Sequence, residues 1–272
     1  MPSKKPYYDH DGITIYHGDC REILPSLGQV DLAITDPPYG IEFQSRYRST
    51  GKTSNSGPRA SSYRFPKIKG DSEDYTDVIE KLINMASRAT YVCTRWDVFS
   101  SLPMPKSLLA WVKDSWSAGD LEHEHGKQWE AICFYPGPDH KFVKRIPDVI
   151  HAKRTLNKHH PTEKPVKLFS KLIAANNGDL ILDPFMGSGS VLIAAKALGK
   201  KAIGIEIEEK YCEVAVKRLL QNKEINKSIS SIDAYLFKHA RTLPCGHAVP
   251  EGEHEHGEED PDHLEMACSL GA

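Results

Sequence analysis

The strongest constraint on the fold is the regular alternation of short apolar runs and helical-period segments in the second half of the chain. Residues 165–176 begin with proline and repeat apolar side chains at helical spacing, which predicts a helix. A strand at 179–182, a helix at 190–198, a strand at 201–205 and a helix at 208–221 are expected to follow. Strands separated by helices predict a mainly parallel sheet with helices on both faces.

Elsewhere in the chain this pattern is interrupted by two segments with few aliphatic residues. Residues 44–70 are rich in Ser, Gly, Arg and Lys, so we expect a long loop of the kind that is usually functional or disordered. The tail from about Leu243 is rich in Gly, Glu and His and is expected to be disordered. A helix is expected at 76–88, and strands are expected at 13–16, 30–35, 89–94, 107–112 and 129–135.

The composition predicts a globular protein that works inside the cell. Of the 272 residues, 39% are hydrophobic and 26% are charged, which are ordinary values for a globular domain. No run approaches the roughly 18 apolar residues of a membrane helix, and the amino terminus lacks the apolar stretch of a secretory signal. The six cysteines stand singly in a chain too long for a small disulfide scaffold, so reduced thiols are expected.

Charge is distributed unevenly along the chain. Residues 241–272 contain eight acidic residues and one arginine, a balance of −7, so the remaining body carries +5 of the overall −2. Residues 41–70 contain seven Lys and Arg against one acidic residue, and residues 137–160 contain six against two. Local basic stretches of this kind fit a polyanionic partner, and they fit solvated loops equally well.

The sequence Asp36-Pro37-Pro38-Tyr39 directly follows the predicted strand at 30–35. In an open α/β sheet, side chains at the carboxyl end of a strand point into the ligand crevice. Asp36 offers a carboxylate that accepts hydrogen bonds, and the prolines stiffen the turn so that the Pro37 carbonyl is a second acceptor. Tyr39 offers a flat face on which a base can stack. Two acceptors that face an aromatic amine would free its nitrogen lone pair for methylation; the alternative is a rigid turn with an incidental aromatic residue.

A glycine turn follows the predicted strand at 179–182. Gly187 and Gly189 carry no side chain, which lets the backbone approach a ligand closely. The next strand ends at Glu206, 23 residues after Asp183, where folds of this kind hold a ribose hydroxyl pair. The third glycine of a dinucleotide fingerprint and the Gly-Lys-Ser/Thr of a triphosphate loop are both missing. This combination predicts a nucleoside-containing cofactor without a pyrophosphate, and S-adenosylmethionine is such a cofactor.

These motifs and their order resemble the amino-methylating DNA methyltransferases, in particular their beta subgroup. In that subgroup the catalytic tetrapeptide comes early and the cofactor glycine loop comes late, and the matching segments cover about residues 13–222. The resemblance implies an α/β fold with a circularly permuted class I, Rossmann-like methyltransferase sheet. It also implies S-adenosylmethionine as the cofactor and double-stranded DNA as the partner. The chain departs from the family pattern at Ser190, where threonine is frequent, and it has no evident target-recognition domain.

The resemblance assigns a role to each matching residue. Asp19 and Cys20 match the segment that contacts the cofactor adenine, and Thr162 and Lys164 match the segment at the methionine end of the cofactor. The implied catalytic residues are Asp36, Pro37, Pro38 and Tyr39, and the implied cofactor-binding residues are Asp19, Cys20, Asp36, Thr162, Lys164, Asp183, Phe185, Gly187, Ser188, Gly189 and Glu206. No metal ligand is expected.

The resemblance, together with the composition of the tail, predicts one methyltransferase domain over residues 1–240 and an acidic, His-rich tail over 241–272. The basic stretches at 41–70 and 137–160 are candidate DNA-contacting insertions. The protein is expected in the cytoplasm of a prokaryotic or phage-infected cell, and the family includes the methyltransferases of restriction–modification systems. The sequence leaves open the recognised DNA site, the choice between monomer and homodimer, and the presence of a restriction partner.

The predicted reaction is methylation of adenine N6 by base flipping and direct transfer. Cytosine N4 is the nearest alternative, because enzymes of that specificity more often carry Ser where Asp36 stands. Protein-glutamine and RNA methyltransferases more often begin the tetrapeptide with Asn. A catalytically silent DNA-binding protein on this scaffold would have no need of an intact tetrapeptide and cofactor loop together. Cytosine C5 methylation requires a cysteine nucleophile, usually in a Pro-Cys pair; Pro244-Cys245 lies in the acidic tail, so this reaction is rejected.

Three weaker features have ordinary structural interpretations. The Cys and His residues of the tail fit no compact zinc finger, and the run 123–125 is expected in a surface loop. The tryptophans are expected mainly in the core or at the flank of the sheet. An alternative for Trp111, at the end of a predicted strand, is a position that borders the DNA. The four tryptophans are Trp96, Trp111, Trp116 and Trp129.

Overall fold

The computed structural model describes residues 5–38, 73–117, 122–123, 125–155, 159–160 and 162–221. These residues all lie within 1–229, the first of the two units into which the chain divides. Tyr39, the predicted loop at 44–70 and the tail at 241–272, with its cysteines and histidines, lie outside the described residues.

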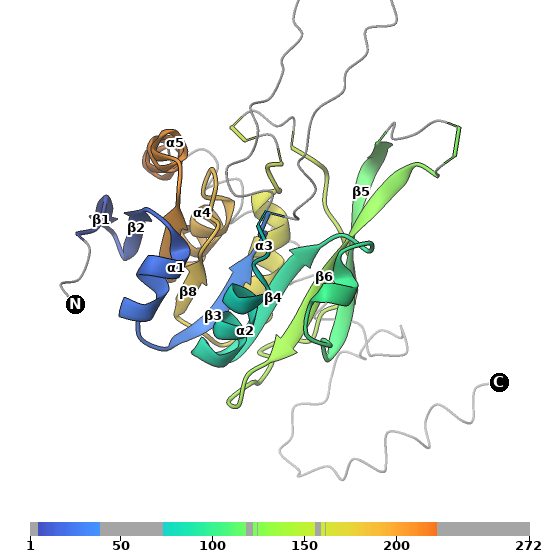
Figure 1. Cartoon of the computed structure of the whole chain (residues 1–272), viewed down its shortest axis with the longest axis horizontal. Coiled ribbons are helices and arrows are strands. Elements are labelled where there is room, and N and C mark those ends of the chain that lie inside the picture. The colour runs from blue at the N-terminus through green and yellow to red at the C-terminus, as the bar shows by residue number, and fades with distance from the viewer. Residues whose placement is uncertain are drawn as a thin grey trace, which may run out of the picture. The chain divides into compact units, whose positions relative to one another are not determined.

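Within the described residues, nine strands form one mixed sheet with the order β1-β2-β9-β8-β3-β4-β6-β5-β7 (Figure 1). Five of its eight neighbouring pairs are parallel, and the pairs β1/β2, β4/β6 and β6/β5 are antiparallel. The strands are β1 (Tyr8–His10), β2 (Ile13–His17), β3 (Val30–Thr35), β4 (Ala86–Thr94), β5 (Ser107–Ser117), β6 (Lys127–Pro136), β7 (Val149–His151), β8 (Leu180–Asp183) and β9 (Lys201–Glu206).

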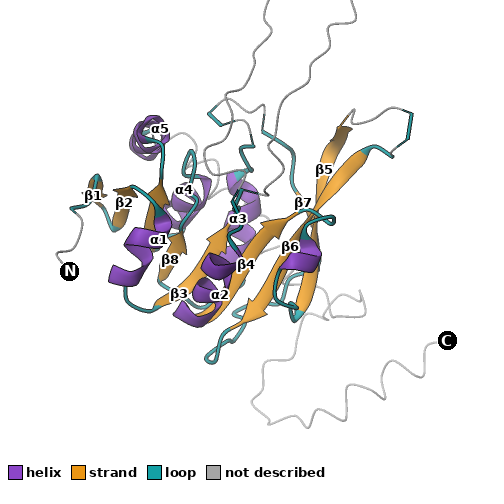
Figure 2. Cartoon of the chain, viewed as in Figure 1, coloured by secondary structure: helices purple, strands orange, loops and turns teal. Residues whose placement is uncertain are grey.

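Helices cover both faces of the sheet, as the strand–helix alternation predicts. In Figure 2, α1 and α2 lie in front of the sheet, and α3 and α4 lie behind it. Among these helices and α5, none is long and apolar enough to cross a membrane. The described helices are α1 (Cys20–Ile23), α2 (Thr76–Met85), α3 (Val166–Ala174), α4 (Ser190–Ala197) and α5 (Glu209–Leu220), with short 3-10 turns at Leu24–Ser26 and Phe99–Ser101.

The side chains of β3 contribute to both of the layers into which the core is divided. Leu32 and Ile34 pack with α3, α4 and α5 on one face of the sheet. Val30 and Ala33 pack with α1 and α2 on the other face. All four side chains are at most 3% exposed, so β3 is buried on both faces, as expected of a central parallel strand.

The sheet contains a topological switch point between β3 and β8. These strands are parallel neighbours, with Leu32 opposite Ile181 and Ala33 opposite Leu182. From β3 the chain returns through α2 to β4 on one side, and from β8 it returns through α4 to β9 on the other side. Ligands of open α/β sheets bind at the carboxyl ends of strands where the chain direction diverges in this way. Both predicted motifs, Asp36 and the glycine turn, follow these two strands.

The structure corrects one predicted element and adds others that the sequence pattern did not reveal. The expected helix at 76–88 ends at Met85, and Ala86 begins β4 with extended dihedral angles. Ala86 pairs with Val30 and is only 1% exposed, so strand pairing prevails over the helix propensity of alanine. The elements β1, α1 and β7 were not predicted, because each has only three or four residues. The four cysteines among the described residues are buried, free thiols.

Candidate active site

Asp36 lies directly after β3 and forms an ion pair with Lys164, a residue 128 positions later in the chain. The Lys164 side chain is 5% exposed and the Asp36 side chain is 18% exposed. The Lys164 Nζ also lies 3.3 Å from Glu130 Oε2 on β6, and the other Glu130 oxygen lies 2.5 Å from Lys113 Nζ on β5. Two carboxylates and two ammonium groups therefore form one chain of charges that ends at Asp36.

Glu130 was not singled out by the sequence, and its ionisation depends on this chain. Burial alone would raise the pKa of its carboxyl group, but the Lys164 and Lys113 ammonium groups lower that pKa below its ordinary value. Glu130 is therefore an anion at neutral pH. A charged strand residue between two aromatic or apolar neighbours carries no local sequence signal, so only the packing of β6 beside β4 reveals its position.

The glycine turn joins β8 to α4 through two residues with left-handed backbone angles. Gly187 has φ +50° and Gly189 has φ +82°, conformations that strain any residue with a Cβ atom. A Cβ at Gly189 would also lie 2.9 Å from the Ala215 Cβ on α5. The turn therefore requires glycine both for its backbone angles and for the close approach of α5, and it leaves the amino end of α4 open to a ligand.

Two buried carboxylates flank this turn. Asp183 at the end of β8 accepts hydrogen bonds from Thr35 Oγ1 and Phe185 N at 3.1 Å each, and burial raises its pKa to about 8. Glu206 at the end of β9 accepts hydrogen bonds from Gly187 N at 3.0 Å and Glu208 N at 2.7 Å. Burial raises the pKa of Glu206 to about 7. Glu206 therefore titrates in the physiological range.

A buried ion pair connects the segment at 160–165 with the glycine turn. Arg218 on α5 lies 3.0 Å from Glu163 Oε1, and both side chains are at most 4% exposed. The same guanidinium donates to the Ser188 carbonyl at 2.8 Å and to the Ser188 hydroxyl at 2.9 Å. Neither Glu163 nor Arg218 was predicted as a site residue, because an Arg on a helix normally indicates a solvated face. Their contact fixes one wall of the site against the other.

His160 lies between α5 and the glycine turn. Its ring packs edge-on against the Tyr211 ring, with 4.4 Å between the centroids, and lies next to Gly187. Burial, together with the nearby Lys164 and Lys210 ammonium groups, lowers the pKa of His160 to about 4. The imidazole is therefore neutral at pH 7, and its Nδ1 accepts a hydrogen bond from the Thr162 backbone at 3.3 Å.

Asp19 and Cys20 lie on the opposite side of the glycine turn, at the end of β2. The Asp19 carboxylate accepts a hydrogen bond from Arg21 N at 2.8 Å and caps α1. The backbone of Gly18 donates to the Glu206 carbonyl at 2.9 Å, which places this segment beside the end of β9. Cys20 is only 5% exposed and packs in the core.

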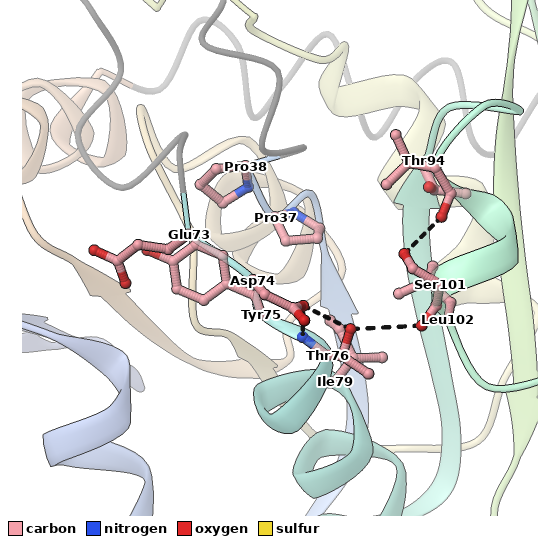
Figure 3. Close-up of a pocket in the computed structure, with 11 residues that line it drawn as sticks. Pro37, Pro38, Glu73, Asp74, Tyr75, Thr76, Ile79, Thr94, Ser101 and Leu102 are labelled. Atoms are coloured by element: carbon pink, nitrogen blue, oxygen red, sulfur yellow. Dashed lines mark hydrogen bonds between the residues drawn. The ribbon is translucent and has the colours of Figure 1, made fainter.

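An aromatic pair not expected from the sequence lies near Asp19. The Tyr75 and Phe185 rings meet edge-on, 4.8 Å between centroids, and the Arg21 guanidinium lies over the Tyr75 ring at 4.5 Å. Tyr75 immediately precedes α2. Its ring also borders a hollow of about 280 Å³ that extends under Pro37 and Pro38 towards Thr94 and Leu102 (Figure 3).

A second, smaller hollow of about 50 Å³ brings together seven of the eleven predicted cofactor-binding residues. Its lining includes Asp36, Thr162, Lys164, Asp183, Phe185, Gly187 and Ser188. Gly189 continues the same turn, whereas Asp19, Cys20 and Glu206 do not line this hollow. Pro37 and Pro38 line the hollow of Figure 3, and Tyr39 lies outside the described residues. Among the described residues, no group of three or more His, Cys, Asp or Glu side chains is arranged to hold a metal ion.

The basic stretch at 137–160 is divided between opposite edges of the sheet. Asp139 N donates to the Ser87 carbonyl and Phe142 bridges to Asn176, so this part lies at the amino ends of β4 and β8. Lys153 and Arg154 follow β7, whose direction is that of the parallel strands, and both are exposed on the edge that carries Asp36. Residues 156–158 lie outside the described residues.

Three of the four tryptophans are not core residues. Only Trp111 is buried, at 3% exposed, and its Nε1 donates to the Ala152 carbonyl at 2.8 Å. Trp96, Trp116 and Trp129 are 64%, 66% and 46% exposed. They lie after β4, near the end of β5 and at the start of β6, which is the Asp36 edge of the sheet. His123 is exposed, as expected of a surface loop.

Proteins of similar sequence are named as methylases or methyltransferases. A family model for N6/N4 methyltransferases, described as DNA methylase, matches residues 93–217. The chain is 32% identical over 219 residues to a protein of Escherichia coli (strain K12) that is named "Putative methylase YubD". The match covers 74% of this chain and 88% of that protein. It is 27% identical over 273 residues to the type II methyltransferase M2.DpnII of Streptococcus pneumoniae, across 82% of this chain and 95% of that protein.

A solved structure shares the fold. The complex of M1.HpyAVI with S-adenosylmethionine aligns with a TM-score of 0.56 at 24% identity, across 76% of this chain and 100% of that chain. The predicted α/β methyltransferase sheet is therefore confirmed, and the predicted cofactor is the one present in that structure. The chain belongs to the N6/N4 family of DNA methyltransferases, the S-adenosylmethionine-dependent enzymes that methylate exocyclic amino groups of DNA bases.

Proposed function

We propose that this protein transfers a methyl group from S-adenosylmethionine to the N6 amino group of adenine in double-stranded DNA. The observation that carries the proposal is the position of Asp36, a carboxylate acceptor at the switch point of the sheet. It lies beside a glycine turn whose Gly187 N–H is held by the buried carboxylate of Glu206, at the strand end where a ribose would bind. The residues fit the cofactor, because the left-handed Gly187 and Gly189 open the backbone and Glu206 presents carboxylate oxygens at the next strand end. When bound there, the cofactor supplies a sulfonium methyl group whose bonding electrons remain on sulfur.

The residues proposed to bind the cofactor surround the glycine turn. Glu206 would accept the ribose hydroxyl hydrogens, and the backbone of Phe185, Gly187, Ser188 and Gly189 would face the methionine part. Asp183 shapes the turn, because its carboxyl group holds both Thr35 and the Phe185 backbone. The remaining proposed contacts come from Asp19 and Cys20 on the adenine side, and from Asp36, Thr162 and Lys164 on the methionine side.

The chain contributes position and charge to the transfer itself. The amino nitrogen of adenine is a weak nucleophile because its lone pair is delocalised into the ring. Asp36 and the Pro37 carbonyl would accept hydrogen bonds from its two N–H groups, and Pro38 and Tyr39 would complete the turn and the stacking face. The freed lone pair forms the new N–C bond and one amino proton is released. Catalysis of this kind rests on orientation and electrostatics, after base flipping that costs a few kcal/mol.

The product identifies the base. Unmethylated genomic DNA incubated with the protein and labelled S-adenosylmethionine is digested to nucleosides and separated by mass spectrometry. The proposal predicts N6-methyladenine as the labelled nucleoside. N4-methylcytosine would retain the chemistry at Asp36 and change the base. Bound cofactor without any methylated nucleoside would overturn the enzymatic proposal and favour a silent DNA-binding scaffold.

DNA is proposed to approach the edge of the sheet that carries Asp36. Lys153 and Arg154 are exposed there. The Arg154 backbone N donates to Asp114 Oδ1 at 3.1 Å, and its guanidinium Nη2 donates to Ser115 Oγ at 2.8 Å. The exposed aromatic rings of Trp96, Trp116 and Trp129 lie along the same edge. Lys141 and Arg145 belong to the same basic stretch but lie toward the opposite edge, too far along the strands to contact a duplex held at Asp36.

Removal of Lys153 and Arg154 should weaken DNA binding through lost phosphate contacts. We expect Lys153→Ala/Arg154→Ala to reduce the slope of log affinity against log salt by about 2, close to one unit per phosphate contact. Fluorescence anisotropy over a salt series measures this slope. Lys141→Ala/Arg145→Ala removes the same charge from the opposite edge and should leave the slope unchanged. Equal slopes for both double variants would contradict the proposed DNA edge.

Cofactor affinity should depend on pH through Glu206. Because burial raises the pKa of this carboxyl group to about 7, the group becomes protonated as the pH falls through 7. A protonated carboxyl loses one acceptor for the ribose hydroxyls, so the affinity for S-adenosylmethionine should be higher at pH 8 than at pH 6. Titration calorimetry at both pH values measures the change. Glu206→Gln should bind weakly and with less pH dependence; a wild-type affinity that is constant over this range would contradict the assignment.

A further inference from the structure

A buried acceptor oxygen beside the catalytic ion pair makes no hydrogen bond. Glu130 Oε2 is fully enclosed and has no hydrogen-bond partner among the described residues. It nevertheless lies 3.3 Å from Lys164 Nζ, close enough for charge attraction but without hydrogen-bond alignment. Buried acceptors are normally satisfied, and an exception requires an explanation. This oxygen lies within reach of the Lys164 ammonium as a second acceptor.

The first position of that ammonium conflicts with the proposed chemistry. In the structure Lys164 Nζ donates to Asp36 Oδ2. The proposed function requires Asp36 to accept a hydrogen bond from the target amino group, and an ammonium on the carboxylate weakens it as an acceptor. The Lys164 side chain is 5% exposed, so its charge cannot be released to water cheaply. A second anion within reach removes the conflict.

We propose that Glu130 is a positioning residue for methyl transfer, which takes over the Lys164 ammonium so that Asp36 can accept the hydrogen bond of the target amino group. This inference rests on the proposed function. Glu130 does not touch the reacting atoms; it acts through Lys164, whose ammonium exchanges its hydrogen bond between the two carboxylates while remaining paired throughout. No covalent bond changes in this exchange, and no proton needs to move.

Glu130 is itself held in place from the other side. Lys113 Nζ lies 2.5 Å from Glu130 Oε1 and 5.3 Å from the centre of the Trp111 ring. Trp111 is buried and donates its Nε1 hydrogen to the Ala152 carbonyl. Oε1 is therefore engaged by a fixed cation, while Oε2 remains directed toward Lys164. This division of the two oxygens is what a positioning residue for Lys164 requires.

Glu130→Gln removes the anion and retains the shape of the side chain. We expect the single-turnover rate of methyl transfer to fall by about 10- to 10²-fold, the size of effect that a small misplacement of a reacting group produces. The affinity for S-adenosylmethionine should change by less than about twofold, because Glu130 does not line the cofactor hollow. Glu130→Asp should recover part of the rate. Glu213→Gln, which removes an exposed partner of Lys217 on α5, is the matched control.

A double variant separates positioning from charge balance. Glu130→Gln/Lys113→Met removes one negative and one positive charge, so the buried cluster stays neutral and its melting temperature should return toward that of the wild type. The transfer rate should stay low, because residue 130 no longer offers Lys164 a second carboxylate beside that of Asp36. Two results would overturn the inference: a transfer rate that recovers in the double variant together with its melting temperature, or an unchanged transfer rate in Glu130→Gln. In either case an active wild-type protein would still support the proposed function. A wild type that methylates no DNA would overturn both.

Discussion

Replacement of Asp36 by alanine is expected to reduce methyl transfer by at least about 10²-fold, the effect of removing one preorganised hydrogen-bonding group that acts in the transition state. The reason is that the amino nitrogen loses the carboxylate acceptor that frees its lone pair. The affinity for S-adenosylmethionine should fall much less than the transfer rate, because Asp36 is only one of the proposed cofactor contacts and the glycine turn and Glu206 are unchanged. Lys164 retains Glu130 as a partner, so the variant should also fold.

Single-turnover transfer and cofactor titration on the same preparations measure these two effects. Asp9→Ala provides a control, because Asp9 is an exposed residue on β1 whose carboxylate accepts a hydrogen bond from Thr14 Oγ1 at 3.1 Å. Near wild-type transfer by Asp36→Ala would contradict the catalytic assignment. Loss of cofactor binding together with transfer would instead make Asp36 chiefly a cofactor ligand.

Replacement of Arg218 by methionine is expected to lower the free energy of unfolding by about 3–5 kcal/mol, the usual cost of removing one partner of a buried ion pair. The variant leaves the Glu163 carboxylate buried without its guanidinium and leaves the Ser188 carbonyl and hydroxyl without their donor. Because Ser188 belongs to the glycine turn, cofactor affinity should fall as well. Denaturant unfolding and cofactor titration measure the two effects.

Neighbouring residues supply the controls for this prediction. Lys217→Ala removes an exposed cation that lies 3.5 Å from Glu213, and its effect should stay within about 0.5 kcal/mol. The double variant Glu163→Gln/Arg218→Met lacks both charges, so its free energy of unfolding should fall less than that of Arg218→Met alone. If Arg218→Met unfolds like Lys217→Ala, the pair does not hold the site together.

The sequence predicted the layout of the fold because its signals were local. Val30–Thr35 is a short strand of mainly apolar residues, and the left-handed angles at Gly187 and Gly189 need glycine whatever surrounds them. Asp36 and the glycine turn, which were predicted from such signals, stand directly after strands, whereas Asp19, Cys20, Thr162 and Lys164 were assigned through the family resemblance. The error at 86–88 has the opposite origin, because the end of α2 is decided by pairing of Ala86 with a strand more than fifty residues earlier.

Glu130, Arg218 and Tyr75 could not be found by the same reasoning. Each acquires its role from a residue distant in sequence: Glu130 from Lys164, Arg218 from Glu163, and Tyr75 from Phe185. An isolated charged or aromatic residue on a strand or helix is usually solvated or packed in the core. Burial of an ionisable group with its partner is the signal that identifies it, and burial exists only in the folded chain.

A crystal structure of the protein with S-adenosylmethionine would test the central claim most directly. The account predicts ribose hydroxyls within hydrogen-bond distance of Glu206, the methionine part against Gly187–Gly189, and the sulfonium methyl directed toward Asp36. A cofactor that binds elsewhere, or that directs its methyl group away from Asp36, would contradict the account.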